Sequence, residues 1–134
     1  EFIESLLKEP NCSIGTDIVG VDLNTISAGA YGAFPKVLGE LTREKNLFSL
    51  EEAVFRMTGL PSQQMQLPNR GVLKKGAFAD ITIFDPLTIN CTSCYTDPHH
   101  LPTGVKYVLI NGKIVLEKAT YNPVLSAGRV IKRT

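Results

Sequence analysis

The spacing of the apolar residues changes at Pro68, and this change constrains the fold more than any other feature of the sequence. Before Pro68, apolar residues recur every three or four positions, as on one face of a helix. After it, apolar and polar residues tend to alternate, as they do in strands. Helices followed by strands predict an α+β architecture, with one segment over residues 1–68 and a second over residues 69–134.

Two of the predicted helices follow from periodicity. Apolar residues at helical spacing predict a helix over residues 2–7, which Pro10 ends, and a longer helix over residues 34–44. The stretch between Gly20 and Gly32 is rich in small residues and is predicted to be a loop.

Two more helices follow from capping signals. Ser49 and Glu52 fit a capping box, in which each side chain bonds the other residue's backbone amide at the start of a helix. Gly59 stands where a C-cap glycine would end that helix. Pro61 suits the first turn of a further short helix.

The second segment is predicted to contain a hairpin. Residues 105–110 and 113–116 flank Asn111-Gly112, and both turn residues tolerate the positive φ that a type I′ turn requires. Further strands are predicted at residues 80–84 and 129–131. Six apolar residues of these strands are expected to share one core: Ile81, Ile83, Val108, Ile110, Ile114 and Leu116.

Asp17 is the first candidate for chemistry. It follows a short apolar run, residues 12–16, that is predicted to be a buried strand, and it precedes the small-residue loop. Barrel enzymes place catalytic carboxylates at such strand ends. A loop aspartate that caps its own turn is the commoner outcome of this spacing taken alone. Asp22 is a nearby competitor, expected to be a solvated loop carboxylate.

Two other groups are expected to be structural. Cys91 and Cys94 form a lone C-x-x-C, and a zinc site would need both His99 and His100, whose side chains project apart in extended chain. Asp80 is expected to bond nearby backbone amides and to align the strands.

Composition excludes several classes. The net charge is +1, with 14 basic and 13 acidic residues dispersed along the chain, so nothing predicts nucleic-acid binding. No apolar run approaches the roughly 20 residues of a membrane span, and the first residues do not resemble a signal peptide. Three cysteines, an odd number, favour reduced thiols and a cytoplasmic location.

Two stretches, GAFPKVLGE at residues 32–40 and GVLKKGAFADITIFD at residues 71–85, resemble the N-acyl-D-amino-acid deacylases (D-aminoacylases) of the amidohydrolase superfamily. The resemblance covers nearly the whole chain. It implies that residues 12–17 are the last strand of a (β/α)8 barrel and that residues 34–44 and 50–58 are its closing helices. The strands after Gly71 would then be part of a small β-sandwich.

A complete barrel needs about 250 residues. The resemblance therefore implies that this 134-residue chain is the C-terminal portion of the enzyme, lacking its N-terminal part and inactive by itself.

The resemblance also implies a chemistry. The parent enzyme would use zinc to hydrolyse the amide of an N-acyl-D-amino acid or a related small molecule. Asp17 would take a proton from the metal-bound water and deliver it to the leaving nitrogen. The principal zinc ligands would lie upstream, so this chain would supply none of them, with Asp17 the one candidate ligand. A homo-oligomer is compatible with this assignment.

Two departures from the family concern the substrate. Ile18 follows Asp17 where many deacylases have glycine. Ser27-Ala28-Gly29 stands where many carry His-Pro-Arg, which makes Ser27 the candidate substrate-binding residue and removes a partner for a substrate carboxylate. The alternatives are a hydantoinase-like or dihydroorotase-like cyclic amidohydrolase, which the sequence of residues 34–44 disfavours, and a non-catalytic interaction module.

Overall fold

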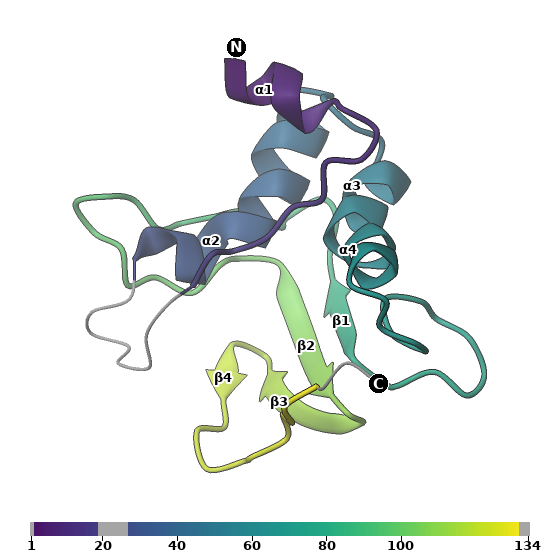
Figure 1. The fold of residues 1–134 in the computed structure, drawn as a ribbon. Helices are drawn as coiled ribbons and strands as arrows, with labels where there is room; N and C mark the ends of the chain where they lie inside the picture. Colours follow the sequence, from purple (N-terminus) through teal and green to yellow (C-terminus); the bar gives the residue numbers. More distant parts are fainter. Residues whose placement is uncertain (1, 19–26, 132–134) are drawn as a thin grey trace.

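The computed structural model describes residues 2–18 and 27–131, and its elements follow the predicted order of helices before strands. In Figure 1 the helices lie together above the sheet, with α1 across the top. The helices are α1 (Phe2–Leu7), α2 (Ala28–Lys36), the π-helix η1 (Val37–Glu44), α3 (Leu50–Met57) and α4 (Gly59–Gln64). The strands are β1 (Ile81–Phe84), β2 (Val105–Ile110), β3 (Lys113–Glu117) and β4 (Thr120–Tyr121).

The helix predicted over residues 34–44 is longer and less regular than expected. It begins at Ala28, so part of the predicted small-residue loop is helical. Pro35 lies inside α2, and from Val37 the helix continues as η1 with wider hydrogen bonding, as in the 2.9 Å bond from the Lys45 amide to the Glu40 carbonyl. A proline inside a helix removes one donor and crowds the preceding turn, which favours such a change of register.

The start of α3 confirms half of the predicted capping box. The Ser49 hydroxyl accepts a 3.2 Å hydrogen bond from the Glu52 amide. The Glu52 carboxylate accepts from Arg56 one turn later in α3. Gly59 directly follows the C-cap residue Thr58, as predicted, but it begins α4 and does not have the positive φ of a helix-ending cap glycine. A side chain at Gly59 would meet the Phe55 ring at 2.8 Å, so close packing explains this glycine.

The four strands form one antiparallel sheet in the order β1-β2-β3-β4. The predicted hairpin is confirmed: Ile110 pairs with Lys113, and the turn residues have φ values of 49° at Asn111 and 80° at Gly112. The strand predicted at residues 129–131 is wrong, and Thr120–Tyr121 provides the fourth strand. A short edge strand next to a tight turn has too weak a hydrophobic pattern to be predicted from periodicity.

The core is centred on the helices. Val37, Leu38, Phe48 and Ala53 pack with Ile89, which belongs to the long connection between β1 and β2. The expected six-residue strand core is wrong, because Ile83 and Ile114 are 48% and 47% exposed. From the sheet, Phe84 of β1 and Val105 of β2 pack against this core.

Candidate functional site

Asp17 lies at the end of an extended segment. Residues 12–16 form no strand in the described part of the chain, which corrects the prediction, because a strand requires a hydrogen-bonded neighbour and none lies beside them there. A backbone hydrogen bond from the Ile14 amide to the Arg56 carbonyl, at 2.9 Å, ties the segment to the end of α3. Asp17 itself is exposed and adopts a left-handed conformation with φ 49°. Its carboxylate is therefore presented to solvent.

Ser27 precedes α2 in the N-cap position. Its backbone is extended (φ −68°, ψ 161°), and its hydroxyl makes no capping hydrogen bond. A Cβ built on Gly29 would lie 3.7 Å from the Ser27 hydroxyl oxygen and 4.0 Å from the Thr16 carbonyl oxygen. The segment that carries Asp17 and the start of α2 therefore lie side by side, as Figure 1 shows. The fold brings the two candidate residues to one end of α2.

A cleft of about 750 Å³ opens beside this end of α2. One wall comes from Ser27 and one side of α2 as far as Lys36, and the other comes from the loop of residues 91–99. The polar groups that line the cleft are Ser27, Lys36, Cys91, Ser93, Cys94, Tyr95 and His99.

The two walls meet at Gly32. A Cβ there would lie 2.0 Å from the Cys91 sulfur, so glycine is required for this approach. Sequence reasoning missed the cleft, because it placed Gly32 in the predicted small-residue loop, whereas the structure places it inside α2.

The Cys/His loop forms its own internal contacts. The Cys91 thiol lies 3.4 Å from the Ser93 carbonyl, and the His100 Nε2 lies 2.6 Å from an Asp97 carboxylate oxygen. The His99 ring packs against Tyr31. Within residues 2–18 and 27–131, no group of three or more His, Cys, Asp or Glu side chains could hold a metal ion. Cys91, Cys94 and His99 therefore have a structural place in the loop wall of the cleft.

The Cys94 thiol, on the loop wall of the cleft, has a perturbed pKa. The Thr96 hydroxyl lies 3.3 Å from its sulfur and can stabilise the thiolate, and backbone hydrogen bonds at Asp97 and Thr96 act in the same direction. Together they hold the pKa of the Cys94 thiol below its ordinary value.

Asp80 has the structural role that the sequence predicts. One carboxylate oxygen accepts a 2.8 Å hydrogen bond from the Asn111 amide at the hairpin turn. The other pairs with Arg70, whose guanidinium also lies over the Phe78 ring. Asp80 therefore ties the hairpin to the chain before β1. Asp22 lies outside the described residues.

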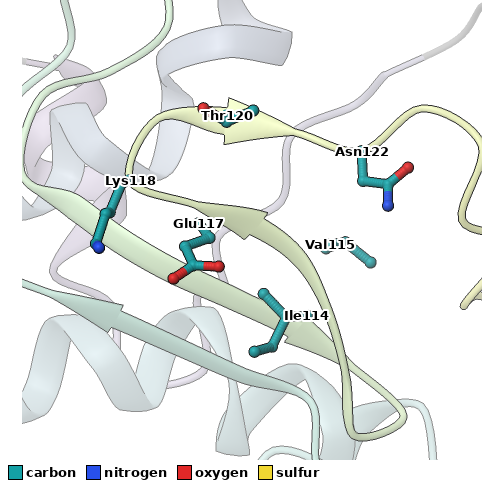
Figure 2. Close-up of a pocket in the computed structure, with 6 residues that line it drawn as sticks. All are labelled: Ile114, Val115, Glu117, Lys118, Thr120 and Asn122. Carbon is teal, nitrogen blue, oxygen red and sulfur yellow. The ribbon is translucent and has the colours of Figure 1, made fainter.

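A second hollow, of about 420 Å³, lies at the end of the sheet. Figure 2 shows its lining side chains, which come from β3, the turn that follows it, β4 and the residue after β4: Ile114, Val115, Glu117, Lys118, Thr120 and Asn122. Neither Asp17 nor Ser27 is among them. The candidate site is therefore the α2 end of the molecule.

The fold is one that solved hydrolase structures share. A crystal structure of a D-aminoacylase matches 90% of this chain with a TM-score of 0.83 and 36% sequence identity. An N-acyl-D-glutamate deacylase from Bordetella bronchiseptica, solved with zinc and a phosphonate inhibitor, matches 88% with a TM-score of 0.80 and 34% identity. Each match covers 25% of the solved chain.

Sequence comparison identifies the family. The profile of the "Amidohydrolase family" matches residues 3–116, and this chain belongs to that family. A D-aminoacylase of Alcaligenes xylosoxydans xylosoxydans is 40% identical over 78% of this chain, and an N-acyl-D-glutamate deacylase of the same organism is 33% identical over 98% of it. The chain spans 21% and 26% of these two relatives, about a quarter of their length.

A dihydroorotase of Carboxydothermus hydrogenoformans is also similar, at 38% identity over 49% of this chain. None of the helices in the described ranges is long and apolar enough to cross a membrane.

Proposed function

We propose that this chain is part of a metal-dependent amidohydrolase that cleaves the amide bond of N-acyl-D-amino acids or related small molecules. The observation that supports it most is the agreement of sequence and fold with D-aminoacylase over 90% of the chain. The dihydroorotase similarity extends over only about half of it. A cyclic amide substrate is therefore the second candidate, and a purely non-catalytic module is the third.

In this proposal the chain supplies the C-terminal end of the barrel, residues 1–68, and strands of a small β-sandwich, residues 69–134. Exposed apolar residues on both segments support it. Phe2 and Ile3 of α1 are 75% and 70% exposed, and Ile83 and Ile114 leave one face of the sheet apolar. Apolar surface of this kind is usually covered in a folded protein. The rest of the enzyme would cover it.

Asp17 is the proposed general base and acid. Its exposed carboxylate can accept a proton from the attacking water and return it to the leaving nitrogen, which converts a poor leaving group into an amine. The Ser27 hydroxyl, which makes no capping hydrogen bond and lies beside the same segment, is the proposed hydrogen-bond partner of the substrate. The cleft between α2 and residues 91–99 offers room for the substrate's acyl group or side chain.

The described residues do not form a metal site by themselves, so the principal zinc ligands in this proposal belong to the remainder of the enzyme. When bound, zinc would activate water and polarise the amide carbonyl. The three free cysteines fit a reducing compartment, which supports a cytoplasmic location.

The test is to express the full-length reading frame that contains this sequence and to assay it with zinc. The panel should contain N-acyl-D- and N-acyl-L-amino acids, dihydroorotate and hydantoin. We expect release of the free D-amino acid, with the L-series and the cyclic amides turned over much more slowly. Size-exclusion chromatography of the same sample would report whether it is a homo-oligomer.

Preferential opening of a cyclic amide would replace the first candidate by the second. The absence of hydrolysis across the panel, in a protein that binds zinc, would contradict both. The zinc ligands that the resemblance implies include a His-x-His pair upstream of this chain. A reading frame that lacks this pair would contradict the metal-dependent mechanism.

A further inference from the structure

A buried arginine clamps the chain just before Asp17. Arg56, at the end of α3, is only 4% exposed. Its Nη1 lies 2.7, 2.6 and 3.1 Å from the carbonyl oxygens of Leu7, Glu9 and Cys12, and its Nη2 lies 3.4 Å from that of Lys8. Four carbonyls, from the last residue of α1 to Cys12, therefore converge on one guanidinium.

One of these four carbonyls, that of Leu7, belongs to the last turn of α1, where the guanidinium serves as a hydrogen-bond donor. The last carbonyls of a helix have no bonding amide within the helix, and a positive charge at that end is favoured. Arginine alone presents five donors in one rigid plane, so it can serve several carbonyls at once. Glu52 holds the other side of the guanidinium through Nε at 2.6 Å, and the Phe48 ring lies 5.1 Å from its central carbon.

The backbone of Arg56 also holds the chain, at a point closer to Asp17. The Arg56 carbonyl accepts the 2.9 Å hydrogen bond from the Ile14 amide, and the Ile14 side chain packs against the helical core. Residues 7–14 are thus fixed at the end of α3 from both the side chain and the backbone of one residue. Asp17 follows three residues later, in a segment that forms no strand here.

We propose that Arg56 is a positioning residue for Asp17: its guanidinium fixes the path of residues 7–14 and so places the Asp17 carboxylate for proton transfer. This inference rests on the proposed amidohydrolase function. It assigns a role to a residue that touches no substrate. Displacement of a catalytic group by about 1 Å can cost roughly 100-fold in rate, so a distant clamp has a measurable effect on turnover.

The test uses Arg56→Lys and Arg56→Met in the full-length enzyme, with hydrogen exchange and kinetics measured on the same samples. Lysine keeps the charge but reaches fewer carbonyls, and methionine keeps the apolar stem but donates to none. We expect the Ile14 amide region, residues 8–17, to exchange at least about tenfold faster in Arg56→Lys, because charge-assisted hydrogen bonds are lost there. Arg56→Met should exchange faster still.

The kinetic expectation separates positioning from simple destabilisation. At a temperature where each variant remains folded, kcat should fall about 10- to 100-fold while KM changes by less than about threefold, with Arg56→Lys retaining more activity than Arg56→Met.

Arg70→Met is the matched control. Arg70 is also a largely buried, paired arginine, but its partners are Asp80 and Asn111 in the sheet segment. That variant should lose stability with normal kcat and normal exchange at residues 8–17.

Faster exchange with wild-type kcat in Arg56→Lys would overturn the positioning role, and so would an equal loss of kcat in Arg70→Met. Slow exchange at residues 8–17 in both Arg56 variants would overturn the clamp itself. An inactive wild-type enzyme would instead contradict the proposed function and the catalytic part of this inference, while the exchange data would still report on the clamp.

Discussion

At the residue scale, Asp17 is the side chain whose role most needs a test. In the full-length enzyme, Asp17→Asn keeps the shape and removes the proton acceptor. We expect kcat to fall by roughly 10²–10⁴-fold, the usual contribution of general acid–base catalysis. Zinc content should stay near normal, because the principal ligands are proposed to lie elsewhere. The measurements are steady-state kinetics and metal analysis on one preparation.

Asp80→Asn is the control for this change. The Asp80 carboxylate pairs with Arg70 and accepts a hydrogen bond from the Asn111 amide. Its replacement should therefore lower the urea midpoint and leave kcat nearly unchanged. Near-normal kcat in zinc-loaded Asp17→Asn would make Asp17 a loop residue without a catalytic role.

A second residue-scale prediction concerns the turn after β1. A backbone hydrogen bond from the Leu87 amide, at 2.9 Å from Asp85 Oδ1, lowers the pKa of Asp85 below its ordinary value, and the Thr88 hydroxyl adds to the effect. A lowered folded-state pKa means that ionised Asp85 stabilises the fold above its unfolded pKa of about 3.9. That stability is lost as the pH falls through the folded-state pKa.

Asp85→Asn keeps an acceptor for the Leu87 amide and removes the charge. Its urea midpoint should therefore fall less than that of the wild type when the pH is lowered from about 5 to about 2. Parallel pH profiles for the two proteins would show that the charge of Asp85 does not stabilise the folded state.

At the element scale, the features predicted correctly from sequence are those with local causes. The Ser49 cap, the Pro61 helix start and the Asn111-Gly112 turn depend on neighbouring residues, and all three are confirmed. The strand predicted at residues 12–16 failed because a strand depends on a partner that the described residues do not supply.

The candidate site also combines features that the sequence predicts with features that depend on contacts between distant segments. Asp17 and Ser27 could be selected as candidate site residues from the sequence. That they lie close together depends on how residues 12–18 pack against α2. The cleft depends on the contact between Gly32 and Cys91, and the clamp depends on Arg56 reaching residues 7–12. Contacts between segments this far apart leave no periodic signal in a single sequence.

Two glycines with positive φ provide an element-scale prediction. Gly112 has φ 80°, and a Cβ there would meet only Ala79 at an ordinary 3.9 Å. Gly112→Ala should therefore cost only the conformational strain, about 1–2 kcal/mol. Gly104 has φ 77°, but a Cβ there would lie 2.4 Å from the Ile89 backbone. Gly104→Ala should cost a further 1–3 kcal/mol or so, because Ile89 must move within the core.

Urea denaturation of the two alanine variants measures this difference. Equal losses of unfolding free energy would mean that the loop around Gly104 can shift without disturbing Ile89.

At the scale of the whole molecule, the helical and strand segments are joined by more than a linker. Ile89 lies between β1 and β2, yet it packs with Val37, Leu38, Phe48 and Ala53 of the helical segment. Arg43 of η1 strengthens this junction by donating a 2.6 Å hydrogen bond to the Ile89 carbonyl. Such a shared core favours a single cooperative unit over two independent ones.

Ile89→Ala should therefore destabilise both segments together. Ile89 is 1% exposed, and removing its side chain should cost roughly 2–5 kcal/mol because the tightly packed neighbours leave a cavity. Hydrogen exchange should accelerate in α3 and in the β2–β3 hairpin by the same factor, with one thermal transition. Leu87→Ala, two residues earlier and 80% exposed, should change stability by less than about 0.5 kcal/mol. If exchange accelerates in only one segment, or if two transitions appear, the segments fold independently and Ile89 is only a contact between them.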